Sequence, residues 1–410
     1  MKKPIVFVIA VIICLLNPFG AFPASWEAVA GFVQNNDDLV SSAKQADSAK
    51  WSYNKSWTNY FPHVSLSGSY SELTDSGTDE IAKSYSTGVS VTQTLFSGFA
   101  NYNALRSAYA NYQMALSSYN KTLSDAYNNV RIAFIELYIA EANLDLSRQI
   151  LAVLKQNTRM IKLRYESGSE DRGNLLATQA FERNGEFSVS SAKRQLESAR
   201  IKLSQLVSEE ISATDGSLNI TYEAEPDFQK LTDASPSYII AKFTLELADI
   251  ADQDTMAEFL PTAQLAWQNR SSGSEWPTTD TSSSWSINLS YSILPGGANI
   301  ADKIINDINL EKARRDLEST RKSVYLNIYD SYRALKDATE NLEVSRVSMQ
   351  ANDERAKIAN ARYNNGLMSF DEWNRIIADD ISSQKSNLQA KKNAFEASSQ
   401  WKNSYGGWEK

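Results

Sequence analysis

The chain has 410 residues and a formal net charge of −8 at pH 7, with one cysteine and one histidine. Such an acidic chain, which has no basic stripe to neutralise phosphates, is not expected to bind nucleic acid. A single histidine and a single cysteine exclude the usual zinc and thiol chemistries, and no Gly-Lys-Ser/Thr phosphate loop occurs. We therefore expect no catalytic residue, no metal, no cofactor and no enzyme activity.

The N-terminus has the pattern of a secretory signal peptide, which we assign to residues 1–24. Two lysines precede an apolar run over 5–16, and small residues follow it. The cleavage point stays open, because Phe22 lies where a small residue is preferred for cleavage after Ala24. Cys14 lies within the apolar run, so the mature chain has no cysteine. Export without disulfides is typical of a periplasmic or outer-membrane protein that is stabilised by packing.

Two unrelated motifs recur at one sequence offset. Tyr165-Glu166-Ser167-Gly168 reappears as Tyr363-Asn364-Asn365-Gly366, and Leu95-Phe96-Ser97-Gly98 reappears as Ile293-Leu294-Pro295-Gly296. Both offsets are 198 residues (363 − 165 = 198; 296 − 98 = 198). A unit of this length is far too long for a solenoid, whose repeats have about 20 to 50 residues. The shared offset therefore predicts an internal duplication of a domain-sized unit.

The first repeat is predicted over 25–234 and opens with a helix over roughly 26–59, since Pro62 ends the helical pattern. A β-hairpin follows over 61–96, where apolar residues such as Val64 alternate with serine and threonine. About ten residues of this alternation is the length of a transmembrane β-strand that has a polar face toward water. No other apolar run reaches the roughly 20 residues of a membrane helix, so a membrane must be entered through strands. The edge of a soluble β-sandwich is the alternative interpretation.

A long helix is predicted over 99–165. From Leu105 to Tyr165 its apolar residues alternate spacings of four and three, which is the 3.5-residue repeat of a left-handed coiled coil. At about 1.5 Å per residue this helix has a length on the order of 100 Å. Gly168 is expected to end it in the left-handed conformation, and a return helix is predicted over 173–206.

A linker is predicted over 209–234, in which Leu218–Tyr222 could add a short strand. The second repeat, 235–410, has the same order of elements. Its opening helix, hairpin, long helix and return helix are predicted at roughly 237–258, 260–294, 299–363 and 370–402. Each return helix has about half the length of its long helix, so each opening helix is expected to stack end to end with a return helix.

Four strands per chain cannot close a barrel, because about eight is the smallest number that leaves no open edge. The chain must therefore oligomerise to insert into a membrane. A dimer would supply eight strands around a filled interior, and a trimer would supply twelve strands around a lumen. Since the long helices belong to the same chain as the strands, a closed barrel would continue into a cylinder of helices. The number of strands per chain and the length of the helices therefore predict a duct.

Several short motifs share their order and spacing with one known family. Phe61-Pro62 and Leu260-Pro261 precede the hairpins, Leu95-Phe96-Ser97-Gly98 joins strand to helix, and a Tyr-x-x-Gly motif ends each long helix. Ser369-Phe370-Asp371-Glu372 follows the second tip as a capping box for the return helix. With these motifs the sequence resembles the TolC-type outer-membrane efflux family, the outer-membrane factors of tripartite efflux and type I secretion systems, across essentially the whole mature chain.

The resemblance implies an α+β membrane protein, in which a homotrimer shares one twelve-stranded β-barrel continued by a long antiparallel α-helical coiled-coil barrel. It implies the outer membrane of a Gram-negative bacterium, with most of the chain in the periplasm. It also implies two protein partners, a periplasmic adaptor (membrane fusion) protein and an inner-membrane transporter, for which the trimer is a passive exit duct. The alternative is an envelope-spanning structural coiled coil that does not conduct. Nothing in the sequence identifies the exported substrate.

The helix-turn-helix tips are the candidate site, because the resemblance places a periplasmic gate there. In the family a tip tyrosine and nearby charges hold neighbouring coils together and carboxylate rings narrow the entrance, and Tyr363 and Glu372 match these positions. Met368 stands where a family arginine can make a restraining link, and Arg375 stands where a second acid is common. A simple constriction of two acidic rings is therefore not implied. The candidate gate residues are Arg164, Tyr165, Glu166, Glu170, Asp171, Arg362, Tyr363, Asp371, Glu372 and Arg375, with the turn glycines Gly168 and Gly366 and the strand-to-helix joins Gly98 and Gly296.

Taken alone, each of these charged residues is as readily explained as a solvated turn charge or helix cap as it is by a role in the gate. Threefold symmetry would turn one carboxylate per chain into a ring of three, and charged rings set ion selectivity, so we expect a cation-preferring pore. The carboxylate pairs Glu209-Glu210 and Asp379-Asp380 are expected as solvent-facing charge on helix surfaces.

Overall fold

A computed structural model describes residues 22–74, 81–215, 218, 220, 224–293 and 296–408. The chain divides into two compact units. The tip unit lies within Met1–Val40, Asn120–Thr232 and Tyr325–Lys410, and the sheet unit within Ser41–Tyr119 and Asp233–Val324. Most of the expected signal peptide, Leu294-Pro295 of the second joining motif and much of the expected strand at 218–222 lie outside the described residues. None of the helices in the described ranges combines the length and the apolar character needed to cross a membrane.

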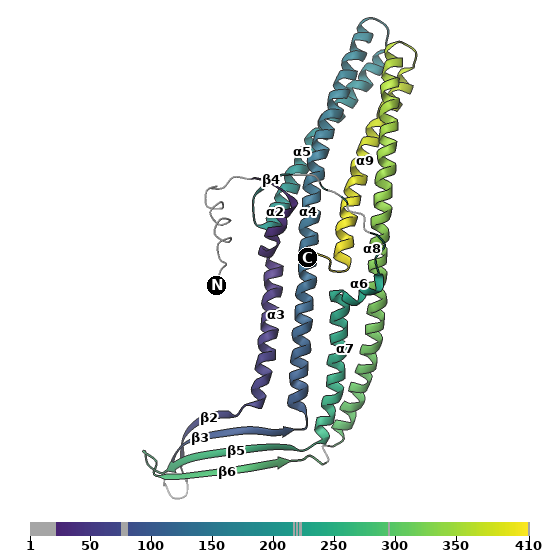
Figure 1. The fold of residues 1–410 in the computed structure, drawn as a ribbon. Helices are drawn as coiled ribbons and strands as arrows, with labels where there is room; N and C mark the ends of the chain where they lie inside the picture. Colours follow the sequence, from purple (N-terminus) through teal and green to yellow (C-terminus); the bar gives the residue numbers. More distant parts are fainter. Residues whose placement is uncertain are drawn as a thin grey trace, which may run out of the picture. The chain divides into compact units, whose positions relative to one another are not determined.

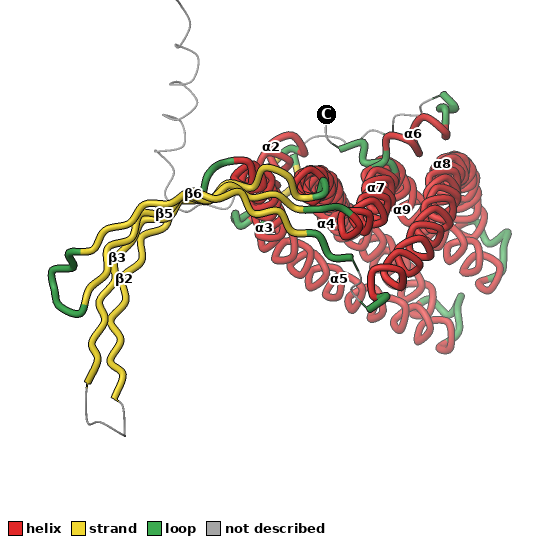
Figure 2. The backbone as a smooth tube through the Cα atoms, turned by 90° about the horizontal axis from the view of Figure 1, so that it is seen from below, coloured by secondary structure: helices red, strands yellow, loops and turns green. Residues whose placement is uncertain are grey.

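The sheet unit contains a four-stranded antiparallel sheet in the order β2-β3-β5-β6, drawn in Figure 1 and seen side by side in Figure 2. Val91 of β3 lies opposite both Val64 of β2 and Trp267 of β5. Directly paired residues share one face of a sheet, so this register gathers the apolar residues on one face. The strands are β2 His63–Thr74, β3 Ile81–Ser97, β5 Thr262–Gly273 and β6 Asp280–Ser290.

The two faces of the sheet differ in chemistry. On the apolar face Leu66 is 82% exposed and Trp285 is 72% exposed. On the other face serine hydroxyls pair across the strands, with 2.7 Å between the Oγ atoms of Ser65 and Ser90. The edge strands β2 and β6 have no second partner strand within the described ranges. Within the described residues, the single chain therefore leaves both a large apolar surface and two strand edges uncovered.

The sheet unit also contains α7 (Pro236–Thr255), which Ser235 caps by accepting the amide hydrogen of Tyr238 at 3.3 Å. The 3₁₀ turn η3 (Met256–Phe259) follows α7. The two long helices, α4 (Ala100–Glu166) and α8 (Ala298–Asn364), begin in this unit and end in the tip unit.

The join between β3 and α4 depends on Gly98, whose φ is +61°. Gly296, at the matching place before α8, has a φ of +72°. A Cβ atom on Gly98 would lie 2.7 Å from the carbonyl oxygen of Ala257, whereas a Cβ on Gly296 would meet no heavy atom within 4 Å.

Gly98→Ala is therefore expected to destabilise the folded protein more than Gly296→Ala. Both variants carry the left-handed backbone cost of about 1–2 kcal/mol, and only Gly98→Ala must also displace a backbone carbonyl, at a further cost of about 1–3 kcal/mol. Thermal unfolding of the two variants in detergent, followed by circular dichroism, measures the difference. Equal shifts of the unfolding midpoint would mean that the chain near Ala257 moves away freely.

The tip unit is built on the distal parts of the long helices. Figure 1 shows α5 (Arg172–Val207) running along α4, and α9 (Phe370–Ser404) running along α8. Residues of the predicted 3.5-residue repeat are buried here, among them Val130, Leu137 and Ile161 of α4 and Ile328 and Leu335 of α8. Thr158, a polar residue of that repeat, is buried because its hydroxyl donates to the carbonyls of Leu154 at 3.0 Å and Thr178 at 3.2 Å.

The opening helix predicted over 26–59 is wrong as one continuous helix. The structure has α2 (Trp26–Gly31), the 3₁₀ turn η1 (Phe32–Asn35), α3 (Asp37–Ser56) and the 3₁₀ turn η2 (Trp57–Tyr60). Asn36 interrupts the helix because its Oδ1 accepts the amide hydrogens of Asp38 at 3.1 Å and Leu39 at 3.2 Å. An asparagine in this position starts a new helix.

The segment before α2 forms a strand that the sequence pattern does not predict. Strand β1 (Phe22–Ala24), which lies in the expected signal peptide, pairs in parallel with β4 (Ile211–Thr214) in the expected linker. The amide of Asp215 also donates to the carbonyl of Ala24 at 2.9 Å. The linker thus contains a strand at 211–214, and Glu141 of α4 accepts the amide hydrogen of Thr214 at 3.0 Å.

The predicted linker also contains a helix, α6 (Phe228–Ala234). Asp227 starts it by accepting the amide hydrogens of Gln229 at 3.0 Å and Lys230 at 3.1 Å. Phe228 packs edge to face on Tyr329, with 5.4 Å between ring centroids. The linker is therefore attached to α8 by an aromatic contact.

Candidate functional site: the tips of the two helical hairpins

Both long helices end in the same kind of turn. Gly168 after α4 has a φ of +75°, and Gly366 after α8 has a φ of +73°. In each turn the amide of the residue after the glycine donates to the carbonyl five positions earlier, at 2.8 Å in the first turn and 2.9 Å in the second. This is the Schellman pattern, in which a left-handed glycine closes the helix.

Side chains cap the return helices. Oδ1 of Asp171 accepts the amide hydrogen of Asn174 at 2.9 Å at the start of α5. Oγ of Ser369 accepts that of Glu372 at 3.3 Å at the start of α9. Of the two hydrogen bonds of the predicted capping box, only the one from the Glu372 amide to Ser369 is present. The carboxylate of Glu372 has no hydrogen bond or ion pair among the residues that the structure describes.

Tyr363, near the end of α8, joins the two hairpins. It is 2% exposed, and its hydroxyl donates a hydrogen bond to Oε2 of Glu170 in the turn of the first hairpin. The other carboxylate oxygen of Glu170 accepts from Nδ2 of Asn174 at 2.7 Å, which fixes the orientation of the carboxylate. Burial, and then the bond to Glu170, raise the pKa of the Tyr363 phenol well above its usual value. The phenol therefore stays a hydrogen-bond donor at neutral pH.

Arg164, near the end of α4, contacts the same tyrosine. Its guanidinium carbon lies 4.6 Å from the centre of the Tyr363 ring. Its Nη2 donates to the backbone carbonyls of Tyr363 at 2.9 Å and Asn364 at 2.8 Å. These are the last carbonyls of α8, at the negative end of the helix dipole, so both hydrogen bonding and the dipole favour a cation there. Arg164 thus ties the end of α4 to the end of α8.

Trp373 of α9 fills the space behind this contact. It is 1% exposed, and its ring stacks on that of Tyr363 with centroids 4.6 Å apart and planes at 12°. Its indole nitrogen donates to Oδ1 of Asn360 at 2.7 Å. Ile161 of α4 and Phe370 of α9 belong to the same buried cluster. We call Arg164, Glu170, Tyr363 and Trp373 the tip clamp.

Three members of the tip clamp are among the candidate residues predicted from the sequence, whereas Trp373 and its partner Asn360 are not. A signal was present in the spacing. Trp373 lies three positions after Phe370, and Asn360 three positions before Tyr363, so each pair shares one helix face.

The other predicted tip residues lie apart from the tip clamp. Glu166 lies 3.9 Å from Lys162 in an exposed ion pair, and Tyr165 is 40% exposed. The side chains of Arg362, Asp371 and Arg375 are exposed and make no hydrogen bond or ion pair within the described part of the chain. The structure thus separates one buried contact between hairpins from a set of solvated charges.

Asp380 of α9 corrects one expectation of the sequence analysis. Asp379 is exposed as predicted, whereas Asp380 is half-buried, and its Oδ1 is buried without a hydrogen-bond partner. Its Oδ2 accepts from Gln384 at 3.0 Å. Burial raises the pKa of the Asp380 carboxyl and Asp353 raises it further, while Gln384 and Lys357 oppose the shift.

A carboxyl whose pKa is raised in the folded state stabilises the fold at low pH and loses that contribution as pH rises through the folded pKa. Asp380→Asn is therefore expected to raise the unfolding midpoint at pH 7, on the order of 1 °C for a protein of this size, and to leave it unchanged near pH 3, below the ordinary pKa of 3.8. Asp379→Asn is the matched control and is expected to have no effect at either pH. Thermal unfolding at the two pH values measures both, and a lower midpoint for Asp380→Asn at pH 7 would contradict the expected sign.

Comparisons with known proteins cover most of the chain. The sequence model of the outer membrane efflux protein family matches residues 32–209. No curated protein matches the chain. A solved structure of CusC aligns with a TM-score of 0.87 at 15% identity, over 96% of this chain and 95% of that one. The CmeC outer membrane channel of Campylobacter jejuni aligns with a TM-score of 0.82 at 14% identity, over 93% of this chain and 85% of that one. The outer membrane protein VceC of Vibrio cholerae aligns with a TM-score of 0.83 at 14% identity, over 93% of this chain and 96% of that one.

Proposed function

We propose that this chain, a relative of the outer membrane efflux proteins over residues 32–209, is the passive exit duct of an efflux or type I secretion system. The resemblance stated from the sequence is confirmed by that family match. An efflux role follows from the family, and the helix-rich chain with one four-stranded sheet is the fold of the solved channels.

The proposal of a trimer rests chiefly on the sheet. Its apolar face is exposed and its edge strands β2 and β6 are free in the described protomer. Three copies would place β6 of one protomer beside β2 of the next and give twelve strands, which is enough for a barrel with a lumen. The apolar face would then meet lipid, and the serine-rich face would line water. The internal duplication, with repeats at 25–234 and 235–410, would explain why each chain supplies two hairpins.

The place of the protein in the cell follows from the same arrangement. The barrel would lie in the outer membrane of a Gram-negative bacterium, and the helices would extend into the periplasm. There the hairpin tips would meet a periplasmic adaptor protein and, through it, an inner-membrane transporter. The duct would supply no energy of its own, so the transporter would drive export.

The experiment that tests this function is the conductance of the purified protein in planar bilayers. Discrete channel openings, together with a mass of three chains in detergent, are the expected results. A protein that forms trimers but does not conduct would favour the alternative, an envelope-spanning structural coiled coil. A protein that stays monomeric and soluble without detergent would contradict both.

The tips would act as the gate, and their solvated carboxylates would set its selectivity. Glu372 is exposed and has no partner among the described residues, so three copies would form a ring of charge. We expect the pore to prefer cations, and we expect Glu372→Gln to reduce the cation-to-anion permeability ratio about twofold or more, since fixed charges select counter-ions. Reversal potentials in a salt gradient measure this ratio. Glu340→Gln, which removes one exposed carboxylate of α8 away from the tips, is the control. Anion preference of the unmodified pore would contradict the assignment.

A further inference from the structure

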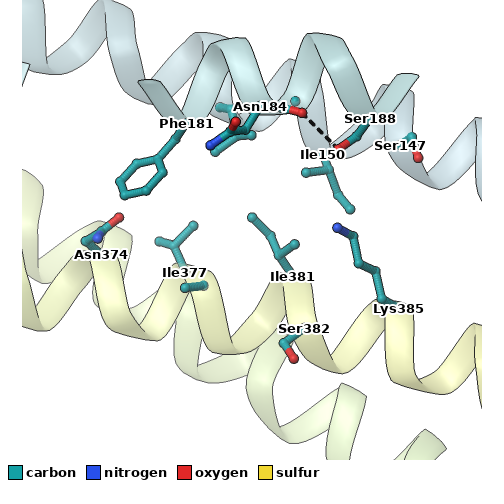
Figure 3. Close-up of a pocket in the computed structure, with 13 residues that line it drawn as sticks. Ser147, Ile150, Phe181, Asn184, Ser188, Asn374, Ile377, Ile381, Ser382 and Lys385 are labelled. Atoms are coloured by element: carbon teal, nitrogen blue, oxygen red, sulfur yellow. Dashed lines mark hydrogen bonds between the residues drawn. The ribbon is translucent and has the colours of Figure 1, made fainter. Parts of the chain in front are cut away.

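A pocket of about 340 Å³ lies between α5 and α9 in the tip unit, with α4 contributing one wall (Figure 3). Its surface is mainly apolar, and Figure 3 shows Phe181, Ile377, Ile381 and Ile150 around one gap. Gly185 of α5 brings α4 close, because a Cβ atom there would lie 3.0 Å from Cδ1 of Leu154. The pocket is thus built from three helices of one unit.

One end of this pocket carries a cation. Lys385 is the only ionisable side chain among the thirteen described residues that line the pocket. Figure 3 shows it beside Ile381, reaching into the gap toward Ile150. Within the described ranges Lys385 has no carboxylate at ion-pair distance, whereas Lys202 pairs with Glu136 at 2.7 Å.

A second, more polar cavity of about 520 Å³ begins where the apolar pocket ends, and Lys385 lines both. Three lysines face this second cavity, Lys202, Lys385 and Lys392, against one carboxylate, Glu136. Lys202 pairs with Glu136 at 2.7 Å and Lys392 pairs with Glu396 at 3.5 Å. Lys385, at the junction of the two cavities, is therefore the one lysine of the three without a carboxylate partner among the described residues.

We propose that this pocket binds an amphiphilic anion, such as a medium-chain carboxylate or alkyl sulfate. The alkyl chain lies along Phe181, Ile377 and Ile381, and the head group pairs with Lys385. Ile377 and Lys385 are eight residues apart (385 − 377 = 8), a rise of about 12 Å, which an extended chain of about ten carbons spans. The site lies between helices and does not depend on conduction through the duct.

The lining excludes other classes of small molecule. A sugar or another strongly polar ligand would leave its hydroxyl groups unpaired against isoleucine and phenylalanine. An alkyl cation would be repelled by Lys385, and a neutral alkyl ligand would gain no ion pair with this exposed ammonium group. An apolar chain that ends in an anion is therefore favoured at both ends of the pocket.

The test is photolabelling of the trimer in lipid nanodiscs with a decanoate analogue that carries a terminal diazirine. Mass spectrometry of peptides then gives the labelling of segments 181–188 and 374–385, with the β-strands as an internal reference for lipid-borne probe. The matching decanol and decyltrimethylammonium probes vary only the head group. Lys385→Gln removes the cation, and Lys193→Gln, an exposed lysine of α5 outside the pocket, is the matched control.

We expect the carboxylate probe to label both segments, unlabelled decanoate to compete, and Lys385→Gln to reduce this labelling about fivefold, as for loss of one exposed ion pair. Lys193→Gln should have no effect. Equal labelling by the three probes, or labelling that Lys385→Gln does not change, would overturn the proposal. Absence of label from both segments would also overturn it, since a second copy of the chain or a partner helix would then occupy the groove.

Discussion

Replacing Arg164 by alanine is expected to raise the open fraction of the purified channel about tenfold. In the tip clamp its guanidinium group donates to the carbonyls of Tyr363 and Asn364 and lies over the Tyr363 ring. A hydrogen bond from a charged donor contributes about 1.5–3 kcal/mol when buried. Arg164 is half-buried, so we expect both bonds together to contribute about 1.4 kcal/mol, which is a tenfold change in an equilibrium constant.

This expectation rests on the proposal that, when the channel opens, the hairpin of α8 and α9 separates from the hairpin of α4 and α5. Single-channel recordings give the open fraction, and Arg362→Ala is the matched control because Arg362 is exposed and its side chain has no partner in the described structure. Arg164→Lys keeps the positive charge but loses the planar guanidinium group that donates to two carbonyls, so an intermediate open fraction is expected. If Arg164→Ala and Arg362→Ala behave alike, the tip clamp does not hold the entrance closed.

The long helices could be predicted from the sequence because their signals are local. The 3.5-residue repeat places a helix over 99–165, and α4 runs Ala100–Glu166. The glycine turn after it and the cap at Asp171 also depend only on neighbouring residues. The β-strands likewise follow from alternation, which requires no knowledge of the partner strand.

The features that could not be predicted depend on distant partners. Strand β1 exists because Ile211–Thr214 lies beside it, about 190 residues along the chain (211 − 22 = 189). A three-residue strand has no period of its own to detect. The break at Asn36 was missed for a different reason, since the apolar pattern continues through it and only the side-chain cap reveals the restart.

The candidate site divides in the same way. Arg164, Glu170 and Tyr363 could be chosen from their place at the tips, but the pairing of Tyr363 with Glu170 spans 193 positions and follows only from how the hairpins pack. Asp379 and Asp380 are both expected to face solvent because the pair lies on a predicted helix surface. A single helical step of about 100° turns Asp380 toward α8 and leaves Asp379 exposed. Burial of one member of an acidic pair is thus a property of the packed structure.

Trp373→Ala is expected to have the largest effect on the stability of the tips, a loss of about 3–5 kcal/mol for a fully buried tryptophan. The variant removes the ring that stacks on Tyr363 and leaves Asn360 without its donor. Trp373→Phe keeps an aromatic ring and loses only the hydrogen bond, so a loss of about 1 kcal/mol is expected. Trp51→Ala, at a position that is 72% exposed, is the matched control and should change little.

Hydrogen exchange of the full-length protein in detergent separates a local loss of stability from global unfolding. The buried cluster around Trp373 includes Ile161, Ala356, Ala359 and Ile377, so faster exchange is expected at the distal ends of α4 and α8 and the first turns of α9. The strands β2 and β3 belong to the other unit and should exchange as before. If Trp373→Ala exchanges like Trp51→Ala at the tips, the stacked ring is not what holds the hairpins together. If exchange also rises throughout the sheet, the tips and the strands unfold as one cooperative unit. An effect of Arg164→Ala on the open fraction would then reflect lower stability of the whole protein rather than gating.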